Sequence, residues 1–175
     1  MSKALAEPQS LTPDEFFSPE NLRKLDQTLT EVFGMMLGCE IRAEHGADCA
    51  NSSALPSGTG KIAIVNFAGA MRGHCEIRVN DPAALAVVSA MLGGNPPTED
   101  VDNSMSDAVG ELCNMVAGGW KNSMPSLESG CSLAPPTVRH EKDGHSDITP
   151  SDLTICRSYV FDTHRLRLTL RLETA

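Results

Sequence analysis

Residues 105–118 constrain the fold of this chain more than any other stretch, because their polarity varies with the period of an amphipathic helix. Consecutive residues of an α-helix are about 100° apart, so residues three or four positions apart share a face. The apolar face would consist of Met105, Ala108, Val109, Leu112, Met115 and Val116. The opposite face would consist of Asp107, Glu111, Asn114 and Gly118. The pattern predicts a helix that packs on a core and exposes a carboxylate beside an amide, with a bare glycine one turn further on.

The remaining sequence predicts strands and two further long helices. Between residues 165 and 173, leucines alternate with polar residues, which is typical of a strand with one buried face. Further strands are predicted over residues 39–43, 61–67, 71–79, 131–141 and 153–161. The further helices are predicted over residues 19–38 and 81–93, and the central helix is expected to end at about residue 122. This order favours an α+β fold, an antiparallel sheet with long helices packed on one face.

The chain is expected to form one domain behind a mobile lead-in. Residues 1–18 contain two prolines and little periodicity, which predicts a flexible N-terminal segment. Residues 19–175 are expected to form a single domain, because this length can enclose a proper core. Met35 and Met36 fall at predicted core positions of the first long helix. The longest largely apolar run, residues 83–92, is shorter than the roughly 20 residues that span a bilayer.

The charge and the cysteines restrict the partners and the compartment. With 14 basic and 23 acidic residues the net charge is −9, which argues against nucleic acid or an anionic membrane as partner. The six cysteines include no Cys-x-x-Cys pair, so neither a zinc site nor a disulfide framework is indicated. Unpaired thiols, together with an N-terminus that lacks a secretory signal pattern, favour a cytoplasmic location.

Two other patterns could carry chemistry and are interpreted as structural. The run from Ser57 to Lys61 resembles part of a phosphate-binding loop, but Leu55 and Ile62 stand where that motif needs glycine and a hydroxyl residue. We therefore expect a linker that leads into a strand. A second run could hold a metal but is more typical of a solvated loop. It consists of His140, Glu141, Asp143, His145 and Asp147.

The exposed face of the central helix resembles the hallmark motif of the CheC/CheX/FliY family of chemotaxis phosphatases. That motif is an Asp or Ser, then Glu-x-x-Asn, then a distant proline, and Asp107, Glu111 and Asn114 match its first part. Pro135 and Pro136 are the candidates for the proline, and we take Pro136. Residues 67–73 and 83–93 also look like the strand-turn-strand and second helix of the family. The resemblance extends from Pro19 to the C-terminus.

This resemblance implies hydrolysis of an aspartyl phosphate on a CheY-type receiver domain, in chemotaxis or related two-component signalling. Asn114 would position the attacking water, and Glu111 would pair with the active-site lysine of the receiver. Asp107, Gly118 and Pro136 would contribute to docking. The receiver would bring its own Mg²⁺, so no cofactor or metal is expected on this chain. Phosphoryl transfer requires positioning and charge stabilisation more than covalent help, which suits such a pair.

The resemblance also indicates a single site. Some members repeat Glu-x-x-Asn on the first helix, whereas Glu31 is followed here by Gly34 at the Asn position. A single site is typical of the CheX branch, whose members tend to be dimers, so a homodimer is possible. The alternative is a non-catalytic adaptor of the same fold that binds a receiver or a flagellar or chemoreceptor partner. Retained receiver binding without phosphatase activity would identify it.

Overall fold

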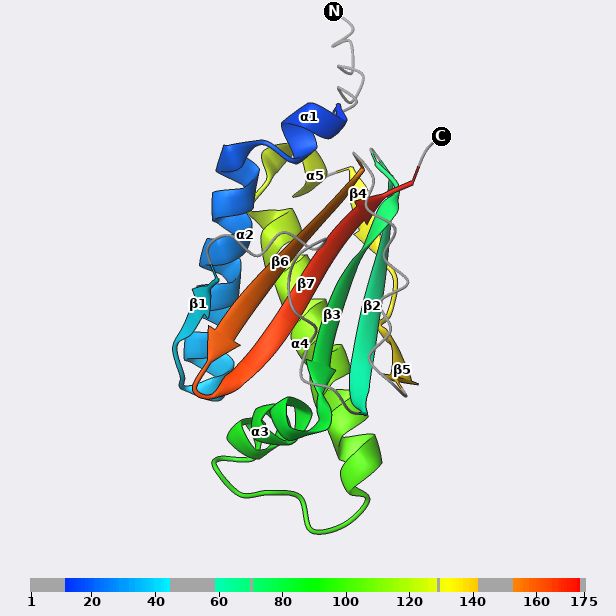
Figure 1. Cartoon of the computed structure of the whole chain (residues 1–175). Coiled ribbons are helices and arrows are strands. Elements are labelled where there is room, and N and C mark those ends of the chain that lie inside the picture. The colour runs from blue at the N-terminus through cyan, green and yellow to red at the C-terminus, as the bar shows by residue number, and fades with distance from the viewer. Residues whose placement is uncertain (1–11, 45–58, 70, 129, 142–152, 174–175) are drawn as a thin grey trace, which may run out of the picture.

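The structure is a computed structural model that describes residues 12–44, 59–69, 71–128, 130–141 and 153–173 (Figure 1). Its helices are α1 (Pro13–Phe16), α2 (Pro19–Val32), the π-helix η1 (Phe33–Leu37), α3 (Asp81–Met91), α4 (Val101–Asn122) and α5 (Pro125–Glu128). Its strands are β1 (Ile41–Ala43), β2 (Gly60–Gly69), β3 (Gly73–Asn80), β4 (Cys131–Leu133), β5 (Thr137–Glu141), β6 (Thr154–Phe161) and β7 (His164–Leu172).

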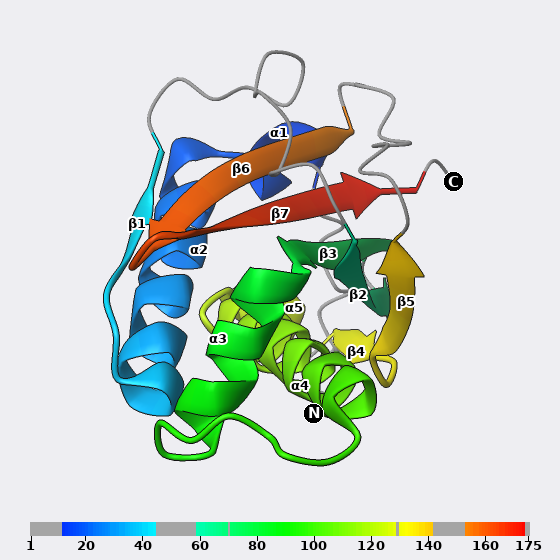
Figure 2. The same ribbon diagram turned by 60° about the horizontal axis from the view of Figure 1, so that its bottom comes forward.

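The strands form one antiparallel sheet, and α2, α3 and α4 lie on the same side of it (Figure 2). The strand order is β1-β6-β7-β3-β2, and the free edge of β2 pairs with both β4 and β5. Strand β4 pairs with residues 67–69 of β2, and β5 pairs with residues 60–64. This arrangement confirms the predicted α+β fold with long helices on one face.

The core lies between the sheet and α4. Alternate residues of the central strands point toward the helices and are fully buried, among them Ala63, Val65, Ile77, Leu168 and Leu170. The predicted apolar face of α4 is buried except for Met115, which is half-buried. Gly110, Cys113 and Ala117 are buried as well, so the covered face of α4 is wider than the sequence pattern indicated. What remains uncovered is a narrow polar stripe along one side of this helix, which consists of Asp107, Glu111, Asn114 and Gly118.

The predicted strand over residues 131–141 is two strands. Pro135 and Pro136 separate β4 from β5, because proline has no backbone N–H to donate to the edge of β2. Between the two strands the N–H of Ala134 still donates to the carbonyl oxygen of Asn66, at 2.9 Å. The chain therefore stays on the same edge of β2 from one strand to the next.

The first long helix changes character at residue 33. Its α-helical part ends at Val32, and η1 continues to Leu37 before Gly38 turns the chain with φ of 64°. A π-helix inserts extra residues per turn and so rotates the following side chains. Met35 is 74% exposed and Met36 is 36% exposed, so the prediction that they occupy core positions is wrong.

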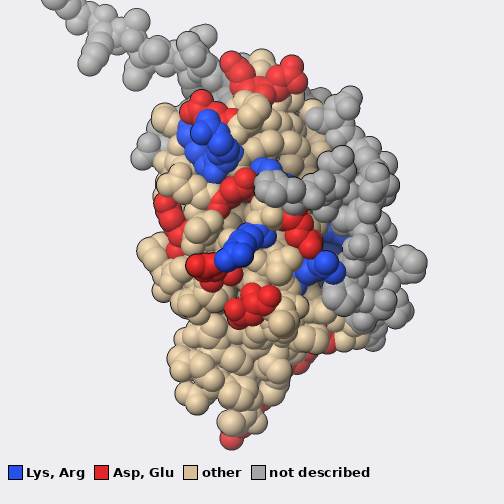
Figure 3. All heavy atoms as spheres, turned by 60° about the vertical axis from the view of Figure 1, so that its left-hand side comes forward, with Lys and Arg blue, Asp and Glu red and all other residues tan. Residues whose placement is uncertain are grey.

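Figure 3 shows that the lower end of the molecule, where α3 lies in Figure 1, carries few charged side chains on this face.

The boundary of the predicted lead-in is also wrong. Residues 13–16 form α1, which begins with a capping box between Thr12 and Glu15. Phe16 is completely buried, with its ring centroid 5.0 Å from that of Trp120 and 5.9 Å from that of Phe67. The folded unit therefore includes at least these residues, while residues 1–11 of the lead-in lie outside the described part of the chain.

Two cysteine predictions have different outcomes. Cys75, Cys113 and Cys131 are buried free thiols and Cys39 is a half-buried one, as expected of small hydrophobic residues. Cys156 on β6 is disulfide-bonded, so the expectation that all six cysteines are unpaired is wrong. Among the described helices none combines the length and the apolar character needed to cross a bilayer.

A buried tyrosine joins β6 to α2. The Tyr159 hydroxyl donates to Asp26 Oδ1 at 2.7 Å, and Arg157 Nη1 lies 3.1 Å from Asp26 Oδ2. Burial, followed by this hydrogen bond, raises the pKa of Tyr159 well above its ordinary value. The phenol therefore remains protonated in the native state at pH values where it ionises in the unfolded chain.

This shift predicts an alkaline loss of stability. Below about pH 10 both states hold the proton, so the stabilisation is complete; above it only the unfolded state releases the proton, and stability falls as pH rises. Tyr159→Phe should have a lower free energy of unfolding at neutral pH, by about 1 kcal/mol for the lost hydrogen bond. Between about pH 9 and 11 the free energy of unfolding of Tyr159→Phe should fall less steeply with pH than that of the native protein, as measured by urea unfolding. Parallel curves for the two proteins would contradict this role of Tyr159.

Candidate functional site

The polar stripe of α4 lies on the surface. Asp107 and Glu111 are exposed, and Asn114 and Gly118 are half-buried. The side chains of Asp107, Glu111 and Asn114 make no hydrogen bond or ion pair with any residue that the structure describes. The structure therefore brings together the four α4 residues that the sequence singled out, and it leaves their functional groups unoccupied by the described parts of the chain.

Pro136 lies beside this stripe. A methyl group added at Gly110 would be 3.8 Å from Pro136 Cβ and 3.0 Å from Val138 Cγ2. Gly110 directly precedes Glu111 and lies one helical turn before Asn114, so the proline approaches α4 close to the motif. Pro135 is exposed, whereas Pro136 is half-buried. Of the two candidate prolines, Pro136 is therefore the one near the motif.

Strand β4 borders the other end of the stripe. A methyl group at Gly118 would be 3.9 Å from Leu133 Cδ1, an ordinary van der Waals distance. The stripe is thus flanked by β4 and β5 near Gly118 and Gly110, while Asp107 and Glu111 face outward. Gly118, which has no side chain, leaves room for another surface to approach the backbone of α4 closely.

Gly110 is a site residue that the sequence analysis missed. Glycine inside a helix costs roughly 1 kcal/mol relative to alanine, and this cost is the available sequence signal. The reason for the glycine is tertiary, because it is the close approach of β5 to α4 that excludes a side chain here. No local pattern could indicate which strand makes that approach.

Gly110→Leu should separate β5 from α4. The larger side chain would displace Val138 and Pro136, and we expect a loss of about 1–3 kcal/mol in the free energy of unfolding. Gly34→Leu is the matched control, because a methyl group at Gly34 would have nothing within 4 Å. Thermal unfolding compares the two variants. Equal stability of both would show that the contact between Gly110 and β5 is not tight.

Lys61 fixes the start of α4. Its side chain is completely buried, and its ammonium group donates to the carboxylate of Asp102 in the first turn of α4. Lys61 Nζ also lies 2.8 Å from His140 Nδ1 on β5. The hydrogen bond from Lys61 lowers the pKa of Asp102 below its ordinary value. Lys61 thus links β2, α4 and β5, the three elements that frame the stripe.

The contacts of Lys61 show how the segment that resembles a phosphate-binding loop enters the fold. Lys61 is the second residue of β2 and is engaged inside the protein, so the predicted strand is confirmed, whereas Ser57 and Gly58 of the predicted linker lie outside the described residues. In the metal-ligand run, Glu141 pairs with Arg78 at 2.8 Å and His140 contacts Lys61. Asp143, His145 and Asp147 lie outside the described residues. Within the described ranges, no group of three or more His, Cys, Asp or Glu residues could hold a metal ion.

The position on the first helix that corresponds to a second site carries no amide. Glu31 on α2 is exposed and accepts a hydrogen bond from Gln27 Nε2 at 2.8 Å. Gly34 lies in η1 and has only open space around it. Glu31 and Gly34 therefore do not reproduce the carboxylate and amide pair that α4 presents.

Comparison with known proteins identifies relatives of this chain. The family model described as chemotaxis phosphatase CheX matches residues 61–155. The CheY-P phosphatase CheX of Thermotoga maritima is 32% identical over 82 residues, which cover 47% of this chain and 52% of that protein. The match thus spans about half the length of that curated relative. The family-model match, over residues 61–155, includes α4 and the two strands that flank the stripe.

Solved structures show the same fold over nearly the whole chain. The chemotaxis protein CheX of Vibrio vulnificus has a TM-score of 0.70 at 22% identity, covering 88% of this chain and 99% of that one. The CheX–CheY–BeF₃–Mg²⁺ complex of Borrelia burgdorferi has a TM-score of 0.61 at 15% identity, covering 88% and 98%. Because the family match spans more than half of this chain and includes its central helix, the chain belongs to the CheX family of chemotaxis phosphatases.

Proposed function

We propose that this protein accelerates hydrolysis of the aspartyl phosphate on a CheY-type receiver domain, using the polar stripe of α4. The observation that carries the proposal is that Glu111 and Asn114 lie together on a rigid helix, with no partner among the described residues. Membership of the CheX family supports it, as does the similarity to a CheY-P phosphatase. The single-site arrangement indicates one receiver bound to each chain.

Asn114 is the residue suited to position the attacking water. Its side-chain carbonyl oxygen can accept a hydrogen bond from water while its NH₂ group donates to a phosphoryl oxygen. Both contacts together would hold the water in line with the bond that breaks. The residue is half-buried and lies one helical turn after Gly110, the position that Pro136 approaches.

Glu111 requires a cation on the partner. A carboxylate beside a phosphoryl group would repel it, so Glu111 is useful only if it pairs with a positive charge. The active-site lysine of a receiver domain is that charge, and a charge-assisted hydrogen bond to it would fix the docked register. Asp107, one turn earlier, and the bare backbone at Gly118 would contribute to the docking surface, with Pro136 at its edge.

The metal in this reaction belongs to the receiver. A complex of relatives from Borrelia burgdorferi contains CheY, BeF₃ and Mg²⁺, which supports a Mg²⁺ ion on the receiver and no cofactor on this chain. Mg²⁺ neutralises charge on the phosphoryl oxygens, and the residues of α4 would act on the water and on the lysine. We expect the protein to work in the cytoplasm, where receiver domains are phosphorylated. A homodimer remains a prediction that light scattering would test.

The direct test measures decay of the acyl phosphate on a cognate receiver with Mg²⁺, with and without this protein. We expect faster decay with the native chain and a loss of roughly 10- to 100-fold in that acceleration for Glu111→Gln, which keeps the shape but loses the charge. Glu31→Gln on α2 is the matched control, because it makes the same change at an exposed glutamate outside the stripe, and it should retain the activity. Equal rates for native protein and Glu111→Gln would remove Glu111 from the mechanism. Receiver binding without any acceleration would identify an adaptor.

A further inference from the structure

Lys121 extends the polar stripe by one more turn. It follows Asn114 by seven residues and Gly118 by three, so it points within about 20° of the direction of Asn114 on α4. The stripe therefore has carboxylates at Asp107 and Glu111 and an ammonium group about two turns beyond Asn114. A surface with opposite charges at its two ends can fix the orientation of a partner as well as attract it.

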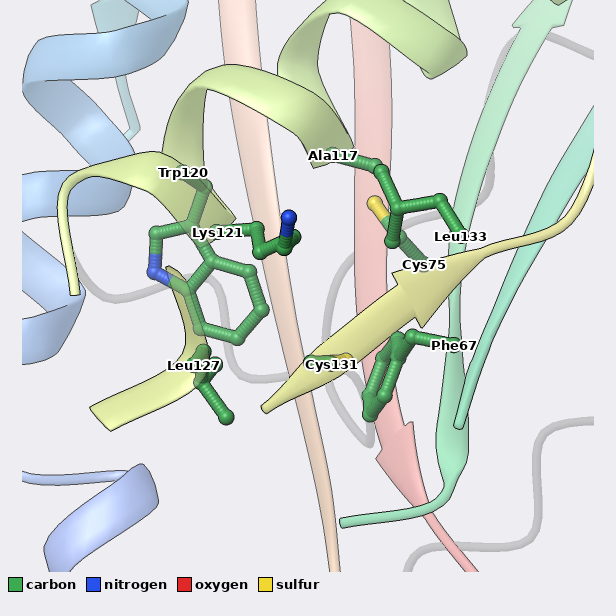
Figure 4. A pocket seen from close by; sticks show the side chains of 8 residues that line it. All are labelled: Phe67, Cys75, Ala117, Trp120, Lys121, Leu127, Cys131 and Leu133. Carbon is green, nitrogen blue, oxygen red and sulfur yellow. The ribbon is translucent and has the colours of Figure 1, made fainter. Parts of the chain in front are cut away.

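A pocket at the end of α4 is lined in part by Lys121 (Figure 4). Apart from Lys121 its lining is apolar or sulfur-containing, and it consists of Phe67, Cys75, Ala117, Trp120, Leu127, Cys131 and Leu133. Such walls favour contact with the methylene groups of a lysine and disfavour burial of its charge. Leu133, which also approaches Gly118, joins the pocket to the stripe.

Lys121 has no counter-ion in the described part of the chain. Two other described lysines are paired: Lys24 Nζ lies 3.2 Å from Glu20 Oε1, and Lys61 contacts Asp102. Lys121 makes no hydrogen bond or ion pair with any described residue, although the chain has 23 acidic residues. Packing of its stem, rather than an internal ion pair, therefore sets the position of its charge.

We infer that Lys121 is a specificity-determining contact that binds a carboxylate on the receiver, about 10 Å along α4 from the site of Asn114. This inference rests on the proposed function, and it names an acidic side chain beside the phosphorylation pocket as the feature that the stripe recognises. The positive end of the stripe meets that carboxylate while Glu111 meets the lysine of the receiver. A receiver turned the other way would bring like charges together at both ends.

The simpler role of Lys121 is local to the helix. It lies in the last turn of α4, where a positive charge favours the helix macrodipole and adds to stability. A purely local role would change the free energy of unfolding and leave receiver recognition unaffected. The two roles therefore differ in what a charge-removing substitution changes.

Lys121→Met tests the inference, because methionine keeps an apolar stem in the pocket and removes the charge. We expect KM for the phosphorylated receiver, and Kd for the receiver loaded with beryllofluoride and Mg²⁺, to rise about two- to fivefold. The value of kcat should stay unchanged, and the salt dependence of Kd should become weaker. Lys121→Glu should raise KM and Kd further, and Lys121→Arg should restore most of the affinity.

Lys24→Met on α2 is the matched control, since it removes a lysine that is already paired and lies on a different helix. Unchanged KM and Kd in both Lys121→Met and Lys121→Glu would overturn the inference, whatever happens to stability. The binding measurement does not depend on hydrolysis. A weaker Kd for Lys121→Met would therefore support the docking role even if the native chain proved inactive, a result that would refute only the proposed function.

Discussion

Asn114→Ala should lose most of the phosphatase activity while still binding the receiver. Removing the amide takes away both the acceptor for the attacking water and the donor to the phosphoryl oxygen. Loss of one preorganised donor at a reacting centre typically costs 10²- to 10³-fold in rate, and we expect a decrease of about that size in kcat. The measurement is the decay of acyl phosphate under single-turnover conditions, with the variant in excess over the receiver.

Retained binding is what separates this role from a structural one. Asn114 is only half-buried and has no partner among the described residues, so its removal should leave the fold and the docking surface intact. Kd for a beryllofluoride-loaded receiver should change by no more than about tenfold, since the lost contact is one hydrogen bond. Loss of binding in parallel with loss of rate would assign Asn114 to docking and contradict the proposed water-positioning role.

Phe16→Ala should cause the largest loss of stability among the substitutions considered. Phe16 is completely buried and packs edge-on against Trp120 of α4 at 5.0 Å between ring centroids. Truncation of a buried phenylalanine costs about 3–5 kcal/mol in the free energy of unfolding. For a domain of this size that corresponds to a decrease in Tm of roughly 6–20 °C. Thermal unfolding followed by circular dichroism measures it.

The control for Phe16 is a substitution in the same short helix. Asp14 is exposed, so Asp14→Asn should change Tm by no more than about 2 °C. If Phe16→Ala were equally mild, α1 would not be part of the cooperative unit. The cooperatively folded domain would then begin at about residue 19, as the sequence predicted.

The features that could be predicted from sequence are those set by local periodicity. The 3.6-residue period of α4 indicated its buried side, and the alternation of leucines near residue 168 indicated the inner face of β7. The positions of Asp107, Glu111 and Asn114 on one exposed face follow from the same period. Their surroundings do not, because these depend on which strand reaches the helix.

The predictions that were wrong concern features that depend on tertiary contacts, on a disulfide or on a change of helix type. Phe16 lies in a short helix whose role is visible only through its contacts with residues far along the chain. The disulfide at Cys156 depends on a partner thiol being close in space, which cysteine spacing alone does not reveal. The exposure of Met35 results from a change of helix type at residue 33, and residue spacing in an α-helix does not anticipate it.

The split between β4 and β5 could have been anticipated. Pro135 and Pro136 are adjacent in a segment predicted as one strand, and proline cannot donate to a ladder. What the sequence could not supply was that both resulting strands pair with the same edge of β2. That pairing brings Pro136 to Gly110 and so completes one side of the candidate site.

The central claim is that the native chain is a catalyst for receiver dephosphorylation. The most direct measurement is the decay of a phosphorylated cognate receiver with Mg²⁺ when this protein is added at about one tenth of the receiver concentration. We predict that all of the acyl phosphate is hydrolysed faster than it decays spontaneously, so that each chain acts on several receivers. Decay at the spontaneous rate, in a mixture where binding of the receiver is demonstrated, would contradict the claim.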